Sequence, residues 1–183
     1  AAGTRGGVIG AASAAAADPT ATLRLEGQVI DTDEQPVAGA MVALSTIPPR
    51  TVRSEADGTF VFTGLPARAF SVAATLDDRL GGPSFVTLTA RTEPVILRMR
   101  RGATVEILAF DVQTTRPLAN VSIELREPVP TQVATGPRGV ARLRAVAPGR
   151  HRLLLTAAGY APAVSWFQTS DQPGAVESHV VGL

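Results

Sequence analysis

Short runs of the chain alternate between apolar and polar residues with a period of two, which is the pattern of half-buried β-strands. In residues 23–29, apolar side chains at positions 23, 25 and 29 alternate with polar ones at 24, 26 and 28. Similar runs predict further strands within residues 40–44, 59–63, 70–74, 86–88 and 95–99. Pro48-Pro49 and Gly81-Gly82-Pro83 are expected to break the chain between strands. This part of the chain therefore reads as about seven short strands.

The best-defined local signal is an Asp-Gly turn that leads into a strand. Gly58 can adopt a positive φ without a Cβ clash, and Asp57 can accept a hydrogen bond from the backbone that follows it. Phe60 and Phe62 come next on one face of the strand, because successive side chains point to opposite faces. We expect both rings to lie in a hydrophobic core.

The pattern returns later in the chain at a constant offset of 81 residues. Residues 36–44 align with residues 117–125, and Gly58 aligns with Gly139. The offset holds from position 36 to about position 75 without a gap, which indicates a tandem duplication.

We therefore predict an all-β fold with two tandem seven-stranded Greek-key β-sandwich domains, at residues 21–101 and 102–183. Residues 1–20 are rich in Ala and Gly and are expected to form a tail or linker. Almost no linker separates the two predicted domains at residues 98–102, which favours a fixed angle between them.

Composition limits the functions that are possible. A net charge of +1 argues against a nucleic-acid binder that relies on bulk electrostatics. No run of 18 apolar residues occurs, so no membrane-spanning helix is expected. All 17 basic residues are arginine, which excludes a Lys–Asn isopeptide crosslink and suggests a GC-rich genome. With no cysteine in the chain, a disulfide framework is also excluded.

Residues 27–44, with Asp57-Gly58-x-Phe60-x-Phe62 and Leu65-Pro66, resemble the carboxypeptidase regulatory-like domain family. The second copy shares the family's pattern at Pro117-Leu118, Val121, Leu143, Pro148-Gly149 and Gly159-Tyr160. It departs from that pattern at Asn120, Arg138 and Ala141. The resemblance implies a prealbumin-like, Ig-like β-sandwich, which in this family is an accessory or spacer module without peptidase chemistry.

This resemblance implies a non-catalytic structural and interaction module of a larger bacterial protein that is periplasmic, cell-surface or secreted. Its expected partners are other domains of the same parent chain. The first residue is not Met, so we expect the chain to be processed or part of something longer. The sequence lacks a Gly-x-Ser-x-Gly or His-Glu-x-x-His motif, and no cofactor is expected. An accessory role beside an enzyme domain remains compatible with this interpretation.

Five arginines cluster late in the chain and form the first candidate site: Arg138, Arg142, Arg144, Arg150 and Arg152. Alternation places Arg142 and Arg144 on the outer face of one strand and Arg152 outward on the next, with Arg138 in the turn before them. Such a patch suits an acidic polysaccharide, lipid headgroups or an acidic protein partner. The competing interpretation is a solvated sheet face whose charges prevent aggregation.

An alternative function is a carbohydrate-binding module in which Trp166 and Tyr160 stack on sugar rings beside the arginines. The competing interpretation, which the sequence favours, places Trp166, Phe167 and Tyr160 in the core of the second domain. That core lacks counterparts of the two phenylalanines of the first.

Three further possibilities remain. Asp31, Asp33 and Glu34 offer oxygen ligands for calcium, as do Asp77-Asp78, although short acidic turns are usually solvated loops. His151 aligns with Phe70, so packing rather than metal binding is expected of it. Finally, residues 1–20 could dock along a neighbour's open sheet edge in a fibre or other assembly.

Overall fold

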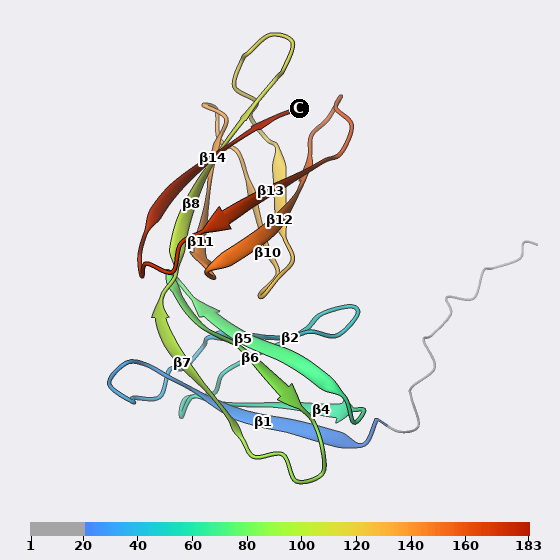
Figure 1. The fold of residues 1–183 in the computed structure, drawn as a ribbon, viewed down its shortest axis with the longest axis vertical. Helices are drawn as coiled ribbons and strands as arrows, with labels where there is room; N and C mark the ends of the chain where they lie inside the picture. The colour runs from blue at the N-terminus through green and yellow to red at the C-terminus, as the bar shows by residue number, and fades with distance from the viewer. Residues whose placement is uncertain (1–20) are drawn as a thin grey trace, which may run out of the picture.

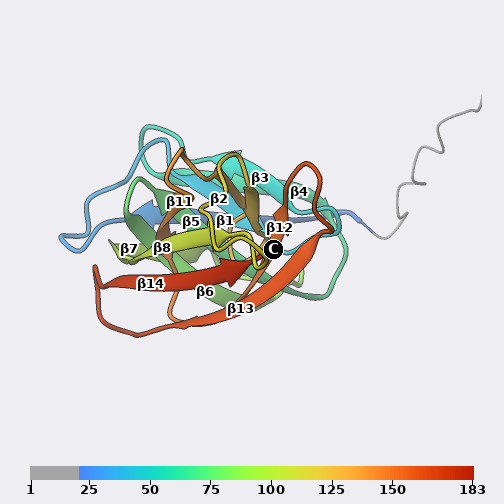
Figure 2. The same ribbon diagram turned by 90° about the horizontal axis from the view of Figure 1, so that it is seen from above.

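The computed structural model describes residues 21–183, so the expected tail at residues 1–20 and its docking role lie outside the described part. The described chain is all-β, as predicted, and contains no helix that could span a membrane. Figures 1 and 2 show two halves stacked along the long axis of the molecule. The first half contains β1 (Leu23–Ile30), β2 (Met41–Leu44), β3 (Arg50–Arg53), β4 (Thr59–Leu65), β5 (Ala69–Leu76), β6 (Arg79–Thr87) and β7 (Val95–Arg101).

The second half has the same number of strands. They are β8 (Ala103–Phe110), β9 (Ser122–Leu125), β10 (Thr131–Ala134), β11 (Val140–Val146), β12 (Gly149–Thr156), β13 (Ala163–Thr169) and β14 (Val176–Gly182).

The order of strands is the same in both halves. In the first half the order is β3-β2-β5-β6-β7-β1-β4, and β6 meets β7 only through residues 79–81 and 99–101. The second half has separate sheets, β10-β9-β12-β13 and β11-β8-β14. The first and last strands of each half pair in parallel, β1 with β7 and β8 with β14. In each half, a four-stranded layer thus faces a three-stranded layer.

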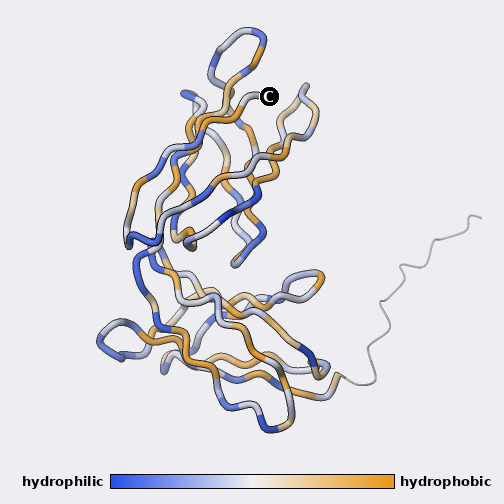
Figure 3. Tube along the Cα trace, in the orientation of Figure 1, coloured by the Kyte–Doolittle hydropathy of each residue, from blue (hydrophilic) through white to orange (hydrophobic). Residues whose placement is uncertain are grey.

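Each half encloses its own hydrophobic core, and the apolar stretches in Figure 3 recur along the strands of both halves. Phe60 and Phe62 are buried in the first core, with ring centroids 6.1 Å apart in an edge-to-face arrangement, which confirms their predicted place. Ala141 and Leu143 are buried in the second core. Smaller side chains there leave room for Phe167.

Two features of the strands differ from the sequence prediction. The expected break at Gly81-Gly82-Pro83 is wrong, because these residues lie inside β6. The register between β5 and β6 shifts between Val72 and Ala74, and Gly82 has a φ of 84° at this irregularity. The glycines therefore accommodate a bulge instead of ending the strand. The edge strand β3, directly after Pro48-Pro49, was not predicted.

A buried hydroxyl group fastens the start of β2 to the end of β3. Ser54 Oγ accepts a hydrogen bond from the Ala40 N–H (2.9 Å) and donates one to the Val37 carbonyl (2.7 Å). The corresponding contacts in the second half, each 81 residues further on, are made by Thr135 with Val121 and Leu118.

Replacing Ser54 by alanine is expected to lower the free energy of unfolding by about 1–3 kcal/mol, because a buried N–H and a buried carbonyl both lose their partner. Urea denaturation measures the change. Ser45→Ala is the matched control, since the Ser45 hydroxyl accepts from the Ser71 N–H at an exposed position, where water can replace it. Equal losses in the two variants would contradict this account.

Candidate ligand-binding site

Trp166 lies on the outer face of the four-stranded sheet of the second half. Its side chain is 50% exposed, whereas the neighbouring Phe167 is 8% exposed and belongs to the core. The prediction that both fill the core is therefore wrong for Trp166. Adjacent residues of a strand point to opposite faces, so only one member of this pair can face inward.

Two arginines of β12 flank the indole ring. Arg152 is the direct cross-strand partner of Trp166, and the guanidinium carbon of Arg150 lies 4.6 Å from the ring centroid. This distance is within the range of a cation–π contact. Leu154 continues the same face of β12 and is half-buried. The combination presents an apolar surface bordered by positive charge.

These side chains border a hollow of about 340 Å³, which we call the Trp166 hollow. Its lining residues are Glu124, Leu125, Arg126, Glu127, Arg150, His151, Arg152, Leu154 and Trp166. Glu124 is paired with Arg126 (Oε1 to Nε, 2.9 Å). Within residues 21–183, neither Arg150 nor Arg152 forms an ion pair with an acidic side chain. Two cations of this hollow are thus available to a ligand.

A second hollow of about 450 Å³ adjoins the first and lies between the two halves. We call it the junction hollow. It shares Arg126, Glu127, Arg150 and His151 with the Trp166 hollow. From the first half it is lined by exposed apolar side chains, including Phe85, which is 84% exposed, and Ile47. The two hollows are thus neighbours that share four lining residues, and we call them together the groove.

The other predicted arginines lie elsewhere. Arg142 and Arg144 are exposed on β11, in the three-stranded sheet, and Arg142 pairs with Glu106 at 2.7 Å. Arg152 belongs to the four-stranded sheet, and both sheets enclose the same core. Their outward side chains therefore point away from each other. Arg138 lies in the turn before β11. Of the predicted arginines, the structure brings Arg150 and Arg152 to Trp166.

Tyr160 does not line the Trp166 hollow. Its hydroxyl donates to Asp111 Oδ2 at 2.7 Å, and Asp111 Oδ1 accepts from the N–H groups of Gln113 and Thr114. The hydrogen bond from Tyr160 lowers the pKa of Asp111 and raises the pKa of Tyr160. Tyr160 therefore anchors the loop after β12 to the end of β8.

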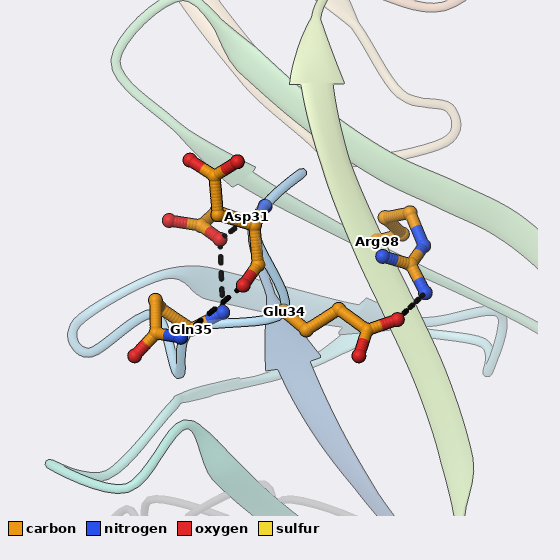
Figure 4. Close-up of polar contacts among 5 residues, drawn as sticks. Asp31, Glu34, Gln35 and Arg98 are labelled. Atoms are coloured by element: carbon orange, nitrogen blue, oxygen red, sulfur yellow. Dashed lines mark hydrogen bonds and ion pairs between the residues drawn. The ribbon is translucent and has the colours of Figure 1, made fainter.

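Figure 4 shows that Glu34 points away from Asp31 and toward Arg98. Asp31 Oδ1 accepts from the backbone N–H groups of Asp33 (2.8 Å) and Gln35 (2.9 Å). Glu34 reaches instead to Arg98, with Oε1 3.2 Å from Nη2. In the part of the chain described, no three His, Cys, Asp or Glu side chains are placed to hold a metal ion. Asp78 lies 3.6 Å from Arg101 in an ion pair.

Both histidines pack against Phe167. The His151 ring lies 5.2 Å from the Phe167 centroid, and its Nε2 is 2.6 Å from the Ala147 carbonyl oxygen. His179 lies 5.6 Å from the same ring, with Nε2 2.8 Å from Ser165 Oγ. Burial lowers the pKa of His179. His151 thus fills a packing position, as its alignment with Phe70 predicts.

Because the pKa of His179 is lower in the folded state than its ordinary value of 6.5, the unfolded chain binds more protons below that pH. We expect the free energy of unfolding to decrease as the pH falls from 6.5 toward the folded pKa. Urea denaturation between pH 5 and pH 8 measures this dependence. The His179→Gln variant should show a weaker dependence, and an unchanged slope would contradict this assignment.

Sequence reasoning missed the first-half side of the groove. Phe85 lies on β6 next to Val86, which packs against the first core, so alternation along the strand places Phe85 outward. A phenylalanine on the outward face of a strand was the sequence signal that could have indicated this side of the groove. The contact between the halves that brings Phe85 near Arg150 and Pro128 gave no comparable signal, because it joins segments far apart in the sequence.

The model of the carboxypeptidase regulatory-like domain family matches residues 24–99, which supports the resemblance for the first half. No curated protein matches the chain.

Similar solved structures include the Bacillus anthracis TIE protein, with 19% identity and a TM-score of 0.40 over 87% of this chain. A streptococcal ancillary pilin has 14% identity and a TM-score of 0.35 over 89% of this chain. The shaft pilin SpaA from Lactobacillus rhamnosus GG has 9% identity and a TM-score of 0.35, covering 87% of this chain and 96% of its own. The present chain spans 33% of the first structure and 63% of the second.

Proposed function

We propose that the chain is a non-catalytic structural module in which two copies of one β-sandwich domain, residues 21–101 and 102–183, form a rigid spacer. The repeated strand order supports the duplication. So do Ser54 and Thr135, which make equivalent hydrogen bonds 81 residues apart. The family match of residues 24–99 supports the accessory role.

The observation that carries the proposal is the contact between the two halves. β7 ends at Arg101 and β8 begins at Ala103, so Gly102 alone connects them. The Gly102 N–H donates to the Asp78 carbonyl at 2.9 Å. A Cβ added to Gly102 would lie 2.7 Å from the Ala145 backbone, so the chain passes close to the second half at this point.

Apolar contacts on both sides of this connection support a fixed angle. Leu80 of β6, which is 1% exposed, packs against Ala145 and Ala147. A second cluster joins Ala43 and Ala73, on the outer face of the first half, to Val129 of the second. Side chains that would otherwise face solvent are thus buried between the halves, and this burial favours one relative orientation.

Rotational diffusion tests the rigid spacer. Backbone ¹⁵N relaxation of the whole chain should give one rotational correlation time and one diffusion tensor for strands β1–β7 and β8–β14. Two shorter, independent correlation times would contradict the proposal.

We place the module in a larger bacterial protein outside the cytoplasm, as the family resemblance implies, with other domains of the same parent chain as partners. The fibre alternative uses residues 1–20 for docking on the sheet edge of a second copy. It predicts concentration-dependent association, which sedimentation velocity detects and which deletion of residues 1–20 should abolish.

Carbohydrate binding is the second candidate function, and the exposed indole of Trp166 favours it. Aromatic rings on the flat outer face of a sheet offer sugars an apolar stacking surface. Tyr160 and the arginines of β11 do not belong to this version of the site. Binding to a glycan array that is lost in Trp166→Ala supports this function, and unchanged binding in the variant contradicts it.

A further inference from the structure

The charge around Trp166 selects among sugars. Arg150 and Arg152 flank the indole without an acidic partner among residues 21–183, whereas Arg126 is paired with Glu124. A neutral sugar stacked on the ring would partly desolvate the two guanidinium groups and give them only neutral acceptors. A carboxylate on the sugar would instead form charge-assisted, bidentate hydrogen bonds with a guanidinium.

We infer that the Trp166 hollow binds uronic acid units of an acidic polysaccharide. This inference rests on the carbohydrate-binding function proposed above. The apolar face of the sugar ring stacks on the face of the Trp166 indole that Arg150 does not cover, and the carboxylate pairs with Arg152, the cross-strand neighbour of Trp166. Arg150 already lies over the indole, so it holds the ring in place and adds positive charge.

The remaining charges limit how anionic the ligand is. Glu127 lines both hollows and forms no ion pair among the described residues, so the groove contains an uncompensated negative charge. A polymer with at most one carboxylate per sugar can place one carboxylate at Arg152 while bringing few other negative charges near Glu127. A densely sulfated glycan or a nucleic acid would bring several negative charges close to Glu127, which is unfavourable.

The shape of the groove favours a polymer over a single sugar. The two hollows share Arg126, Glu127, Arg150 and His151, so a chain that leaves the Trp166 hollow enters the junction hollow. There Phe85 offers a second apolar surface, 84% exposed and supplied by the other half. A ligand that spans both surfaces contacts both halves, so affinity should increase with ligand length until Phe85 is reached.

Calorimetric titration of the full chain with oligogalacturonates, alginate and hyaluronan oligosaccharides of defined length tests the inference. At least one of them should bind, and its methyl ester, which keeps the rings and removes the charge, should bind about ten-fold or more weakly. Arg152→Gln and Trp166→Ala should each weaken binding to a similar extent. Arg144→Gln, on the outer face of the other sheet, is the matched control and should change Kd less than about two-fold.

Two further comparisons, of oligosaccharide length and of the chemical class of the ligand, complete the test. Phe85→Ala should weaken binding of the longer oligosaccharides and leave the shortest ones unaffected. Equal binding of acid and ester, or of neutral glycans, overturns the uronate inference while leaving the carbohydrate-binding function intact. No binding to any glycan overturns both. Binding of poly-glutamate in place of glycans, with the same loss in Arg152→Gln, would identify an acidic protein as the ligand and overturn the inference.

Discussion

Replacing Gly58 by alanine is expected to lower the free energy of unfolding by about 2–5 kcal/mol, through backbone strain and a steric clash. Gly58 has a φ of 76°, and a Cβ at this position would lie 2.4 Å from the Val29 carbonyl oxygen in β1. Because β1 is held between β4 and β7, the carbonyl cannot move away without distorting the sheet.

Gly39→Ala is the matched control for this variant. Gly39 has nearly the same φ, 72°, but an added Cβ would find no atom within 4 Å. The Gly39→Ala variant should therefore lower the free energy of unfolding by only about 1–2 kcal/mol, because the left-handed backbone conformation is the sole unfavourable feature there. Urea denaturation of both variants separates strain from steric contact, and equal losses would contradict the assigned role of Gly58. The Gly139→Ala variant should lose about as much stability as Gly58→Ala, because the added Cβ would lie 2.6 Å from the Ala109 carbonyl oxygen.

The second large effect is expected at the contact between the halves. Leu80→Arg introduces a charge where Leu80, 1% exposed, packs on Ala145 and Ala147. Burying an unpaired charge costs several kcal/mol, so the halves should separate rather than enclose it. We expect a single thermal unfolding transition in the parent chain and two in the variant, measured by differential scanning calorimetry.

Thr87→Arg controls for the added charge, because Thr87 lies on the same strand and is exposed. It should unfold in one transition, like the parent. Two transitions in the parent chain itself, or a single unchanged transition in Leu80→Arg, would contradict the proposed docking of the halves.

Local features of the fold were predictable because they depend on neighbouring residues. The Asp-Gly turn forms as expected, since Asp57 Oδ1 accepts from the Thr59 N–H at 3.0 Å and Gly58 takes a positive φ. Phe60 and Phe62 follow with the period of a strand and are buried. By contrast, Gly81-Gly82-Pro83 looks like a turn in sequence but forms a bulge, because β5 pairs with it across the irregularity.

The candidate site was predictable only in part. Once Phe167 is assigned to the core, strict alternation places Trp166 on the outer face of the sheet. This is the same face that was predicted for Arg152, its cross-strand partner. The division of the arginines between two sheets depends on which strands pair, a long-range property. The same holds for the groove, because Phe85 and Arg150 meet only after the halves dock. The contacts of the acidic turn were not predictable either, because Asp31 Oδ1 accepts from backbone N–H groups and Glu34 pairs with Arg98, which is distant in the sequence.

The central claim is that the two halves keep one fixed orientation, which both the spacer role and the groove require. The chain contains no cysteine, so spin labels can be attached solely at introduced positions. Thr63→Cys on β4 and Val180→Cys on β14 place labels on exposed strand positions in different halves. Pulsed electron spin resonance should give a single narrow distance distribution. A broad or multimodal distribution would show that the halves move independently and would contradict the account.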